Sequence, residues 1–254
     1  MDTPHRGASF LSVLLLFLLV SCSLPSLISA SSFCNPSDRR ALSKIKKSLN
    51  IPHYFDSWNP WKLSIDCCRW NYVDCNTAGR VTQLSFYTIH APFHIPEAIG
   101  DLPYLNYLVF KDITNFTGSI PYSITKLHNL EFLEIQNTSL SGPIPEFLGQ
   151  LKNLNSLFLG YNQLSGPLPA SLGNLNRLEV LDVRSNKLTG SIPDSFGGFN
   201  NDFEDGFFLF LSHNQLSGKV PKSLNISKVD LSYNKLSDAS TFEILSDLGT
   251  LPES

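Results

Sequence analysis

The chain has 254 residues, of which 42% are hydrophobic and 16% are charged, and its formal net charge is −3. No block of basic residues accompanies this balance, so the composition argues against nucleic acid as a partner. The hydrophobic share is enough for one continuous core, although it does not set the number of domains.

The first thirty residues have the layout of a secretory signal. His5 and Arg6 precede an apolar run over residues 10–20, and a stretch with small residues ends at Ala30. This run is far shorter than the roughly 20 apolar residues that a membrane span needs. We therefore predict a signal peptide over residues 1–30, cleaved after Ala30, and a secreted, soluble mature chain without a membrane span.

The cysteines gather near the N-terminus. Of the five in the chain, Cys22 leaves with the predicted signal, and the others are Cys34, Cys67, Cys68 and Cys75. An even set of cysteines in an oxidising compartment indicates disulfide bonds. The adjacent Cys67 and Cys68 are not expected to pair with each other, which leaves two connectivities open. A metal site is the alternative, but the cluster holds no histidine, and we expect no metal.

Residues 33–50 have a helical pattern. Asn35 suits the N-cap, Pro36 suits the first helical position, and Asp38 favours the positive end of the helix dipole. One helical face carries the apolar side chains of Ala41, Leu42, Ile45 and Leu49. Basic residues lie elsewhere on the helix: Arg39, Arg40, Lys44, Lys46 and Lys47. We interpret them as a solvated face rather than as a patch for an anionic polysaccharide.

Three tryptophans surround the cysteines: Trp58, Trp61 and Trp70. Large aromatic side chains beside a disulfide commonly plug the end of a core. A stack of repeats would otherwise end in exposed apolar surface. We therefore predict that residues 31–80 form an N-terminal cysteine cap.

A pattern of about 24 residues then recurs, with its three clearest copies beginning at Leu130, Leu154 and Leu178. Each copy reads L-x-x-L-x-(I/L/V)-x-x-(T/N)-x-L-x-G-x-(I/L)-P. A fixed period of this length with this leucine spacing is the signature of a leucine-rich repeat solenoid. Aligned on the strand, about seven repeats over residues 81–236 begin at Val81, Leu105, Leu130, Leu154, Leu178, Gly206 and Ile226.

Each position of the repeat has a physical role. The leucines alternate along a short strand and point into the core. The asparagines (Asn162, Asn186, Asn214 and Asn234, with Thr138 as a weaker substitute) are expected to form a ladder that satisfies buried backbone groups. Glycines 118, 142, 166, 190 and 218 permit a left-handed bend. The predicted fold is an α/β leucine-rich repeat solenoid: short parallel strands on a concave face, 3-10 or extended convex segments, and a helical, disulfide-bonded N-terminal cap.

The convex segment Leu140–Pro145 and the cap cysteines resemble the plant-specific class of these repeats. More closely, residues 34–240 look like plant polygalacturonase-inhibiting proteins, with particular similarity at Cys34–Pro36, Asp66–Trp70, Asp101–Leu105, Ser195–Gly197 and Leu211–Gly218. The resemblance implies the disulfides Cys34–Cys67 and Cys68–Cys75. It also implies a secreted, cell-wall defence protein that binds and inhibits microbial, notably fungal, polygalacturonases.

The C-terminal part departs from that family, whose members continue into a second cysteine-bearing cap. The chain stops 18 residues after Leu236, and no cysteine follows Cys75. We expect a fragment, a splice form or a diverged member, with residues 237–254 as an irregular tail. Apolar residues in this tail suit a short helix over the last repeat. We expect a monomer unless this end associates with another copy.

The resemblance places the partner-binding site on the concave face. Outward strand positions supply the candidates: Tyr87, Lys111, Phe132, Glu134, Gln136, Phe158, Tyr161, Asp182, Arg184, Phe208, Phe210 and His213. The strand pleat is expected to turn Phe132, Phe158, Phe208 and Phe210 to solvent. Exposed aromatics among charges suit a protein interface, whereas the plainer interpretation is a soluble face whose aromatics cover neighbouring strands.

Catalysis is not expected. Glu134 and Asp182 lie two strands apart, roughly 10 Å at about 4.8 Å per strand, near the upper limit of about 9.5 Å for an inverting glycosidase. Phe158 stands between them, and an open face has no deep pocket. His213 is a lone histidine. We predict a protein that is not an enzyme and needs no cofactor.

Three sequons are predicted glycosylation sites: Asn115, Asn137 and Asn225. A glycan on Asn137, at the concave rim, would conflict with an interface at that edge. The alternative function is a receptor-like or developmental leucine-rich repeat protein that recognises a peptide, a co-receptor or pectin.

Overall fold

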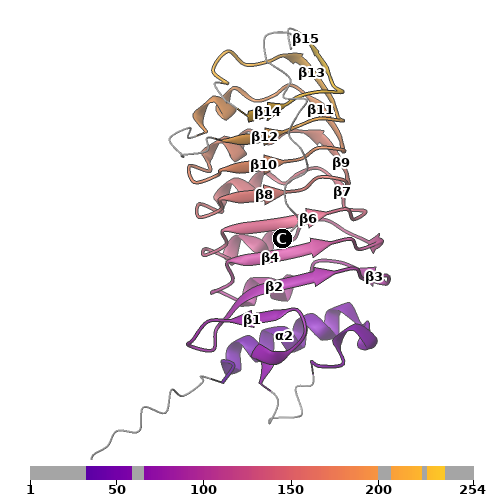
Figure 1. Cartoon of the computed structure of the whole chain (residues 1–254), viewed down its shortest axis with the longest axis vertical. Coiled ribbons are helices and arrows are strands. Elements are labelled where there is room, and N and C mark those ends of the chain that lie inside the picture. The colour runs from indigo at the N-terminus through magenta and orange to yellow at the C-terminus, as the bar shows by residue number, and fades with distance from the viewer. Residues whose placement is uncertain (1–32, 59–65, 200–206, 225–227, 238–254) are drawn as a thin grey trace, which may run out of the picture. The chain divides into compact units, whose positions relative to one another are not determined.

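The computed structural model describes residues 33–58, 66–199, 207–224 and 228–237 (Figure 1). All of them belong to one compact unit, Ser32–Ser254. The predicted signal peptide, Trp61, the sequon at Asn225 and nearly all of the predicted tail lie outside the described residues.

Helix α2 (Pro36–Leu49) begins where the sequence predicts. The Asn35 side chain accepts a hydrogen bond from the Ser37 backbone N–H, and Pro36 occupies the first turn. The helix ends at Asn50, which adopts the left-handed conformation. Two one-turn helices and a strand complete the cap: η1 (Pro52–Phe55), η2 (Cys67–Arg69) and β1 (Val73–Cys75).

The basic residues of α2 mostly make contacts within the protein. Lys44 Nζ lies 2.7 Å from Asp101 Oδ2, and Lys46 Nζ donates to two backbone oxygens of the cap. The Arg39 guanidinium lies 5.5 Å from the centre of the Trp70 ring. These contacts hold the cap together, so they favour the interpretation without a polysaccharide patch.

Aromatic side chains fill the core under the cap, as predicted. Trp58 and Trp70 are buried and stack with ring centroids 5.6 Å apart. Phe55 packs edge-on against Trp58 at 4.6 Å, and Phe86 of the first repeat continues the cluster. The disulfides pair Cys34 with Cys67 and Cys68 with Cys75, at Cα separations of 5.4 and 5.5 Å, which is the pairing that the resemblance implies.

A buried ion pair joins the cap to the first repeat. Asp38 is fully buried, and its carboxylate accepts hydrogen bonds from Arg80 Nε and Nη2 and from the Val81 backbone N–H. The sequence suggests only a helix-dipole role for Asp38. Its main partners come from residues more than forty positions along the chain, which local patterns cannot reveal.

The main sheet has eight strands in the order β1-β2-β4-β6-β8-β10-β12-β14, and all its pairs except β1–β2 are parallel (Figure 1). After β1 its strands are β2 (Val81–Tyr87), β4 (Tyr107–Lys111), β6 (Phe132–Gln136), β8 (Ser156–Phe158), β10 (Val180–Asp182), β12 (Phe208–Phe210) and β14 (Lys228–Asp230). The register confirms the predicted alignment, because Glu134, Phe158, Asp182, Phe210 and Asp230 are successive partners.

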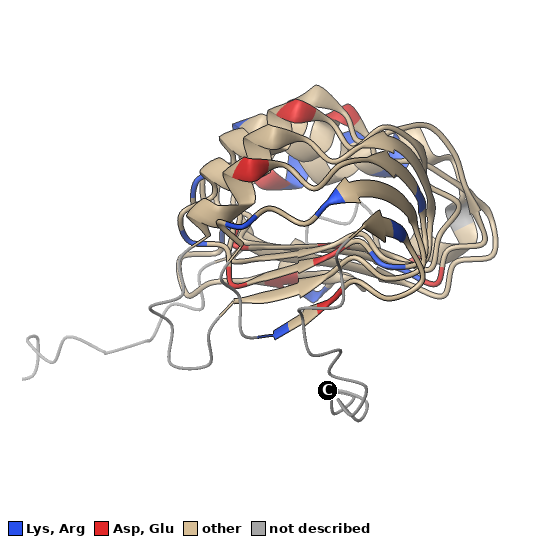
Figure 2. Cartoon of the chain, turned by 90° about the horizontal axis from the view of Figure 1, so that it is seen from above, with Lys and Arg blue, Asp and Glu red and all other residues tan. Residues whose placement is uncertain are grey.

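The expected extended segments form further strands. A five-stranded sheet in the order β15-β13-β11-β9-β7 contains β7 (Ser141–Gly142), β9 (Gln163–Pro167), β11 (Lys187–Gly190), β13 (Gln215–Lys219) and β15 (Lys235–Ser237). β3 (Pro92–Phe93) pairs with β5 (Asn115–Phe116). One-turn 3-10 helices return the chain: η3 (Glu97–Asp101), η4 (Tyr122–Lys126), η5 (Glu146–Gln150), η6 (Ala170–Asn174) and η7 (Asp194–Gly198). Seen from above, the main sheet lies opposite these helices (Figure 2).

The asparagine ladder forms as predicted. Asn186 Nδ2 donates to the carbonyls of Leu159, Val183 and Arg184, and its Oδ1 accepts from the Leu164 N–H. Asn214 and Asn234 make the corresponding bonds, and so does the Nδ2 of Asn162, whose Oδ1 instead accepts from the backbone N–H and the hydroxyl of Thr138. Thr138 lacks a carboxamide, so its own hydroxyl takes the Leu140 N–H instead. The ladder satisfies backbone groups at the interior ends of the strands.

Two kinds of glycine recur for different physical reasons. Gly166 has φ of +79° and a Cβ there would meet nothing closer than 3.8 Å, so its role is conformational. Gly173, in a one-turn helix, has little space, since a Cβ would lie 2.4 Å from the Ser195 carbonyl oxygen. The repeat pattern predicts the first kind, whereas only the packing of adjacent turns reveals the second.

Candidate binding face on the main sheet

The outward-pointing side chains of the main sheet and of the residues directly after its strands form the surface that the sequence predicts as concave, called the open face below. Acidic and basic residues both lie on this sheet (Figure 2). Tyr87, Lys111, Tyr161 and His213 are exposed. Partly exposed candidates are Phe132, Glu134, Gln136, Phe158, Arg184 and Phe208.

The central column of the open face is more covered than expected. Phe210 is only 8% exposed and Asp182 only 2% exposed, so the prediction that Phe210 faces solvent is wrong. The pleat does turn Phe210 away from the main core cluster. However, strands about 4.8 Å apart bring long side chains of flanking columns over the centre. The Arg184 guanidinium, for example, lies over the Phe210 ring at 4.3 Å.

An aromatic cluster occupies the N-terminal half of the face. Tyr107 and Phe132 stack almost parallel, with ring centroids 4.2 Å apart and an interplanar angle of 4°. Phe132 also contacts Phe158, with a centroid separation of 5.4 Å. Tyr107 is 39% exposed and is absent from the predicted site. Its register position beside Phe132 is the sequence signal that could have included it.

Ion pairs accompany these aromatics. Glu134 lies 3.5 Å from Lys111 Nζ. Burial raises the pKa of Glu134, although Lys111 opposes the shift. Asp182 lies 2.9 Å from Arg184 Nε, and burial raises the pKa of its carboxyl group against the effect of Arg184. Both pairs therefore combine a desolvated carboxylate with a cation that remains partly exposed.

The C-terminal half of the face carries a second polar and aromatic group. Asp230 accepts hydrogen bonds from the backbone N–H and the hydroxyl of Ser232. Burial opposes ionisation of Asp230, but hydrogen bonds from Ser232 and Ser212 bring its pKa below the ordinary value. His213 stacks on Tyr233 at 4.2 Å, and Tyr233 is 75% exposed. Tyr233 also belongs to the face, although the predicted site omits it.

The rim after each strand is a column of residues with positive φ: Thr88, Asp112, Asn137, Tyr161, Ser185, His213 and Tyr233. The Asn137 side chain donates to Asp112 Oδ1 at 2.6 Å, so this sequon lies at the rim with its amide nitrogen engaged. Asn115 is exposed on β5, which is not part of the main sheet. A glycan on Asn115 would therefore be attached away from the strands of the open face.

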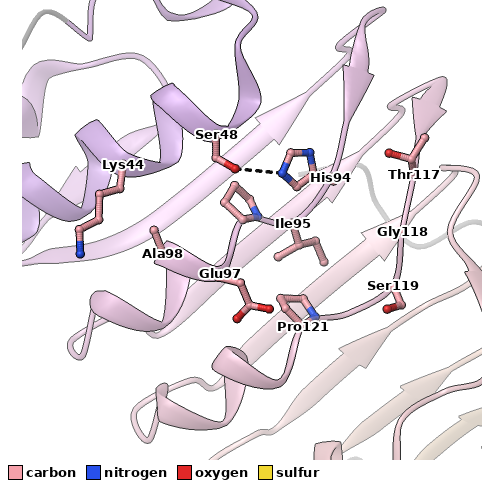
Figure 3. A pocket seen from close by; sticks show the side chains of 11 residues that line it. Lys44, Ser48, His94, Ile95, Glu97, Ala98, Thr117, Gly118, Ser119 and Pro121 are labelled. Carbon is pink, nitrogen blue, oxygen red and sulfur yellow. Dashed lines mark hydrogen bonds between the residues drawn. The ribbon is translucent and has the colours of Figure 1, made fainter.

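A pocket in the described part of the chain lies away from the open face. An open pocket of about 480 Å³ lies between α2 and the first turns of the repeats (Figure 3). Ser48 and His94 face each other across it at 3.0 Å, with Lys44 and Glu97 nearby in the lining. None of the predicted site residues lines this pocket. Glu134 and Asp182 on the open face are instead held in ion pairs on a sheet surface, an arrangement suited to binding.

Two other features concern the metal site and the membrane span that were considered from the sequence. Cys34, Cys67, Cys68 and Asp66 cluster closely enough to suggest a metal site. Their sulfurs are disulfide-bonded, and Asp66 accepts hydrogen bonds from the backbone N–H groups of Cys34 and Cys68, so the cluster serves the cap. Within the described ranges, no helix has the length and apolar character to cross a membrane.

Comparisons with known proteins bear directly on this architecture. The family model for the leucine-rich repeat N-terminal domain matches residues 35–76. The leucine-rich repeat model matches residues 129–151, 153–175 and 177–199. The chain is 46% identical over 128 residues to a polygalacturonase inhibitor of Vitis vinifera, covering 50% of this chain and 37% of that protein. It is 48% identical over 123 residues to polygalacturonase inhibitor 2 of Arabidopsis thaliana, covering 47% and 36%.

Solved structures extend the similarity. A plant ice-binding protein is 40% identical with a TM-score of 0.73, over 80% of this chain and 65% of that one. The ectodomain of the receptor kinase SOBIR1 from Arabidopsis thaliana is 30% identical with a TM-score of 0.57, over 72% and 95%. The matched segments span little more than a third of the length of the curated relatives named above.

Proposed function

Because the chain belongs to the leucine-rich repeat family and resembles its polygalacturonase inhibitors, we propose that it binds and inhibits microbial polygalacturonases through the open face. In this proposal the protein is secreted to the plant cell wall, as its predicted signal peptide and the resemblance suggest. Inhibition follows from docking, which obstructs the access of pectin to the enzyme.

The observation that carries this proposal is the composition of the open face. Tyr87 and Tyr161 are exposed by 44% and 51%, and the stacked pair Tyr107–Phe132 lies on the same sheet. Aromatic and arginine side chains are the groups that most often carry the affinity of protein interfaces. Tyr87, Tyr107 and Phe132 project from strands of the hydrogen-bonded sheet, whereas Tyr161 lies on the rim that follows β8.

Inhibition assays test the proposal. The chain, secreted from a eukaryotic host so that its disulfides form, is mixed with a panel of fungal polygalacturonases, and the release of reducing sugar from polygalacturonate is measured. We expect inhibition of at least one enzyme at or below micromolar concentrations. Lack of inhibition across the whole panel by a protein with native circular dichroism would refute the proposal.

Matched tyrosine variants locate the surface. Tyr161→Ala removes a 51% exposed side chain from the rim of the open face, whereas Tyr122→Ala removes a 62% exposed side chain from η4. We expect the first change to weaken inhibition about tenfold and the second to leave it unchanged. Equal effects would place the interface elsewhere on the molecule.

One observation favours a second candidate function, ice binding, which is the activity printed for the similar plant protein. The five-stranded sheet carries one hydroxyl side chain per strand: Ser141, Ser165, Thr189, Ser217 and Ser237. A regular array of hydroxyls over a sheet can match the regular oxygen lattice of ice. The strand partners of these residues include Lys187 and Lys235, whose strongly hydrated charges interrupt the array, so this function ranks second.

An ice recrystallisation assay separates the two candidates. Thr189→Tyr places a bulky ring on an exposed position of the five-stranded sheet, and Tyr161→Ala alters only the open face. If the chain binds ice through the hydroxyl array, the first variant loses activity and the second retains it. Absence of any recrystallisation inhibition by the unmodified chain would remove this candidate.

A further inference from the structure

Arg184 is the cation of the open face whose position is most fully determined. Its Nε lies 3.0 and 2.9 Å from the two carboxylate oxygens of Asp182, and its backbone N–H donates to the same carboxylate at 3.0 Å. Its guanidinium also rests on the Phe210 ring at 4.3 Å. One edge and one face of the guanidinium plane are therefore already occupied.

The support beneath Arg184 is itself buried. The Asp182 side chain is 3% exposed and occupies the space over Gly160, where a Cβ would lie 3.1 Å from Asp182 Oδ1. Gln136 Nε2 approaches the same carboxylate at 3.5 Å. Because glycine leaves this space free, the carboxylate lies low in the sheet surface and holds Arg184 from below.

The outer edge of the guanidinium remains available. Its two Nη groups carry four N–H donors, and within the described parts of the chain neither has a hydrogen-bond partner. The Arg184 side chain is 26% exposed. A planar guanidinium that presents both Nη groups matches the two oxygens of a carboxylate. Since Asp182 and Phe210 already restrict the side chain, binding costs less side-chain entropy than for a mobile arginine.

We propose that Arg184 is a preorganised anchor that binds the carboxylate of an aspartate or glutamate side chain on the protein partner. The class of partner rests on the proposed function, whereas the anchor rests on the geometry of Arg184. Asp182 and Phe210 are positioning residues, which act on the partner only through Arg184.

The surrounding charges favour an acidic side chain over an anionic polysaccharide. Asp230 lies close enough to influence the ionisation of Arg184, and Glu134 lies on the same face. A polygalacturonate chain carries a carboxylate on successive sugars, so its further charges would meet Asp230 and Glu134, although Lys111 pairs with Glu134. A protein segment with one acidic residue among neutral or basic residues avoids this repulsion and also contacts the aromatic side chains.

Binding measurements with three variants test the anchor. Affinity is measured by surface plasmon resonance for the fungal polygalacturonase that the unmodified chain inhibits most strongly. We expect Arg184→Gln to raise Kd about 30-fold and Arg184→Lys about 10-fold, because lysine keeps the charge but loses the fork. Arg177→Gln is the matched control, since Arg177 is an exposed arginine that directly precedes the repeat of Arg184 and bonds to Asn153 outside the main sheet; we expect less than about a 2-fold change.

A second measurement determines the binding of the same variants to de-esterified polygalacturonate, and two outcomes of these measurements overturn the proposal. In the first, the Kd of Arg184→Gln for the polygalacturonase lies within about 3-fold of that of the unmodified chain, and its thermal midpoint is unchanged. This result would show that Arg184 makes no anchor contact. Loss of binding to de-esterified polygalacturonate on Arg184→Gln, without any loss of binding to the enzyme, shows that the ligand is a polysaccharide instead.

A third measurement does not depend on a polygalacturonase partner. Acetate, the simplest carboxylate, is titrated into the ¹⁵N-labelled chain while the guanidinium resonances are followed by NMR. We expect the Arg184 Nη signals to shift and saturate at lower acetate concentration than those of Arg177. Equal responses of the two arginines would refute the anchor, even if the chain inhibits polygalacturonases. Selective saturation at Arg184 would support it, even if the proposed inhibition fails.

Discussion

The attachment of the cap depends on Asp38, and this dependence can be tested by Asp38→Ala. The change removes the three hydrogen bonds that Arg80 and Val81 donate to an acceptor whose side chain is 1% exposed, and it leaves Arg80, 18% exposed, without its carboxylate. Three bonds to a charged group at about 1.5 kcal/mol each amount to about 4.5 kcal/mol. This value agrees with the about 3–5 kcal/mol usual for breaking a buried ion pair from one side.

Tryptophan fluorescence during urea unfolding measures this loss, because all three tryptophans of the chain lie in the predicted cap. Circular dichroism follows the repeats separately, since a solenoid can unfold in more than one step. Asp101→Ala is the control: its pair with Lys44 joins the same helix to η3, but the two side chains are 39% and 65% exposed. That change should cost less than about 1 kcal/mol. If Asp38→Ala and Asp101→Ala lowered the free energy of unfolding equally, burial of the ion pair would not explain its contribution to stability.

Three further predictions concern the repeats and the open face. Asn214→Ala leaves the carbonyls of three residues and one backbone N–H without their ladder partner, and we expect it to lower the free energy of unfolding in urea by about 3 kcal/mol. Gly166→Ala should cost about 1–2 kcal/mol through backbone strain alone, whereas Gly173→Ala should cost about 3 kcal/mol, because its Cβ would collide with the Ser195 carbonyl oxygen. Burial raises the pKa of Asp182 above the ordinary 3.8, so its contribution to stability is full below that pH and is lost as pH rises through the raised pKa. The difference in unfolding free energy between the unmodified chain and Asp182→Asn should therefore fall as pH increases from below 3.8.

Each of these three predictions would be contradicted by a specific result. A loss below about 1 kcal/mol for Asn214→Ala would show that water replaces the ladder bonds. A larger loss at Gly166 than at Gly173 would reverse the assignment of strain and crowding to these two positions. A difference between the unmodified chain and Asp182→Asn that rises with pH would mean that Arg184 outweighs burial and lowers the pKa of Asp182.

Local and periodic features were predictable from the sequence. The start of α2 follows from Asn35 and Pro36, whose effects extend over only a few residues. The register of the strands follows from the leucine spacing, since a slip of one residue would turn the leucines out of the core. The ladder asparagines follow because each serves backbone groups in its own turn and the adjacent one. Even Tyr107 could have joined the predicted site through its place in the register.

Other features depend on contacts between distant residues. β1 pairs with the first repeat through an antiparallel ladder that no repeat pattern announces. The packing of Gly173 against Ser195 is set by the distance between neighbouring turns. Phe210 has the sequence position of an outward residue, yet it is buried because Arg184 lies over it. Exposure on an open sheet therefore depends on which side chains occupy the neighbouring columns, as well as on the pleat.

The solenoid, its register and the set of side chains that the main sheet presents are encoded locally, because they follow from spacing along the chain. The way in which those side chains combine depends on the folded chain. The fold buries Asp38 against Arg80, and it holds Arg184 between Asp182 and Phe210 with its outer edge available. These arrangements depend on distances between strands and turns and on the space that Gly160 leaves, which the spacing of residues in the sequence does not contain.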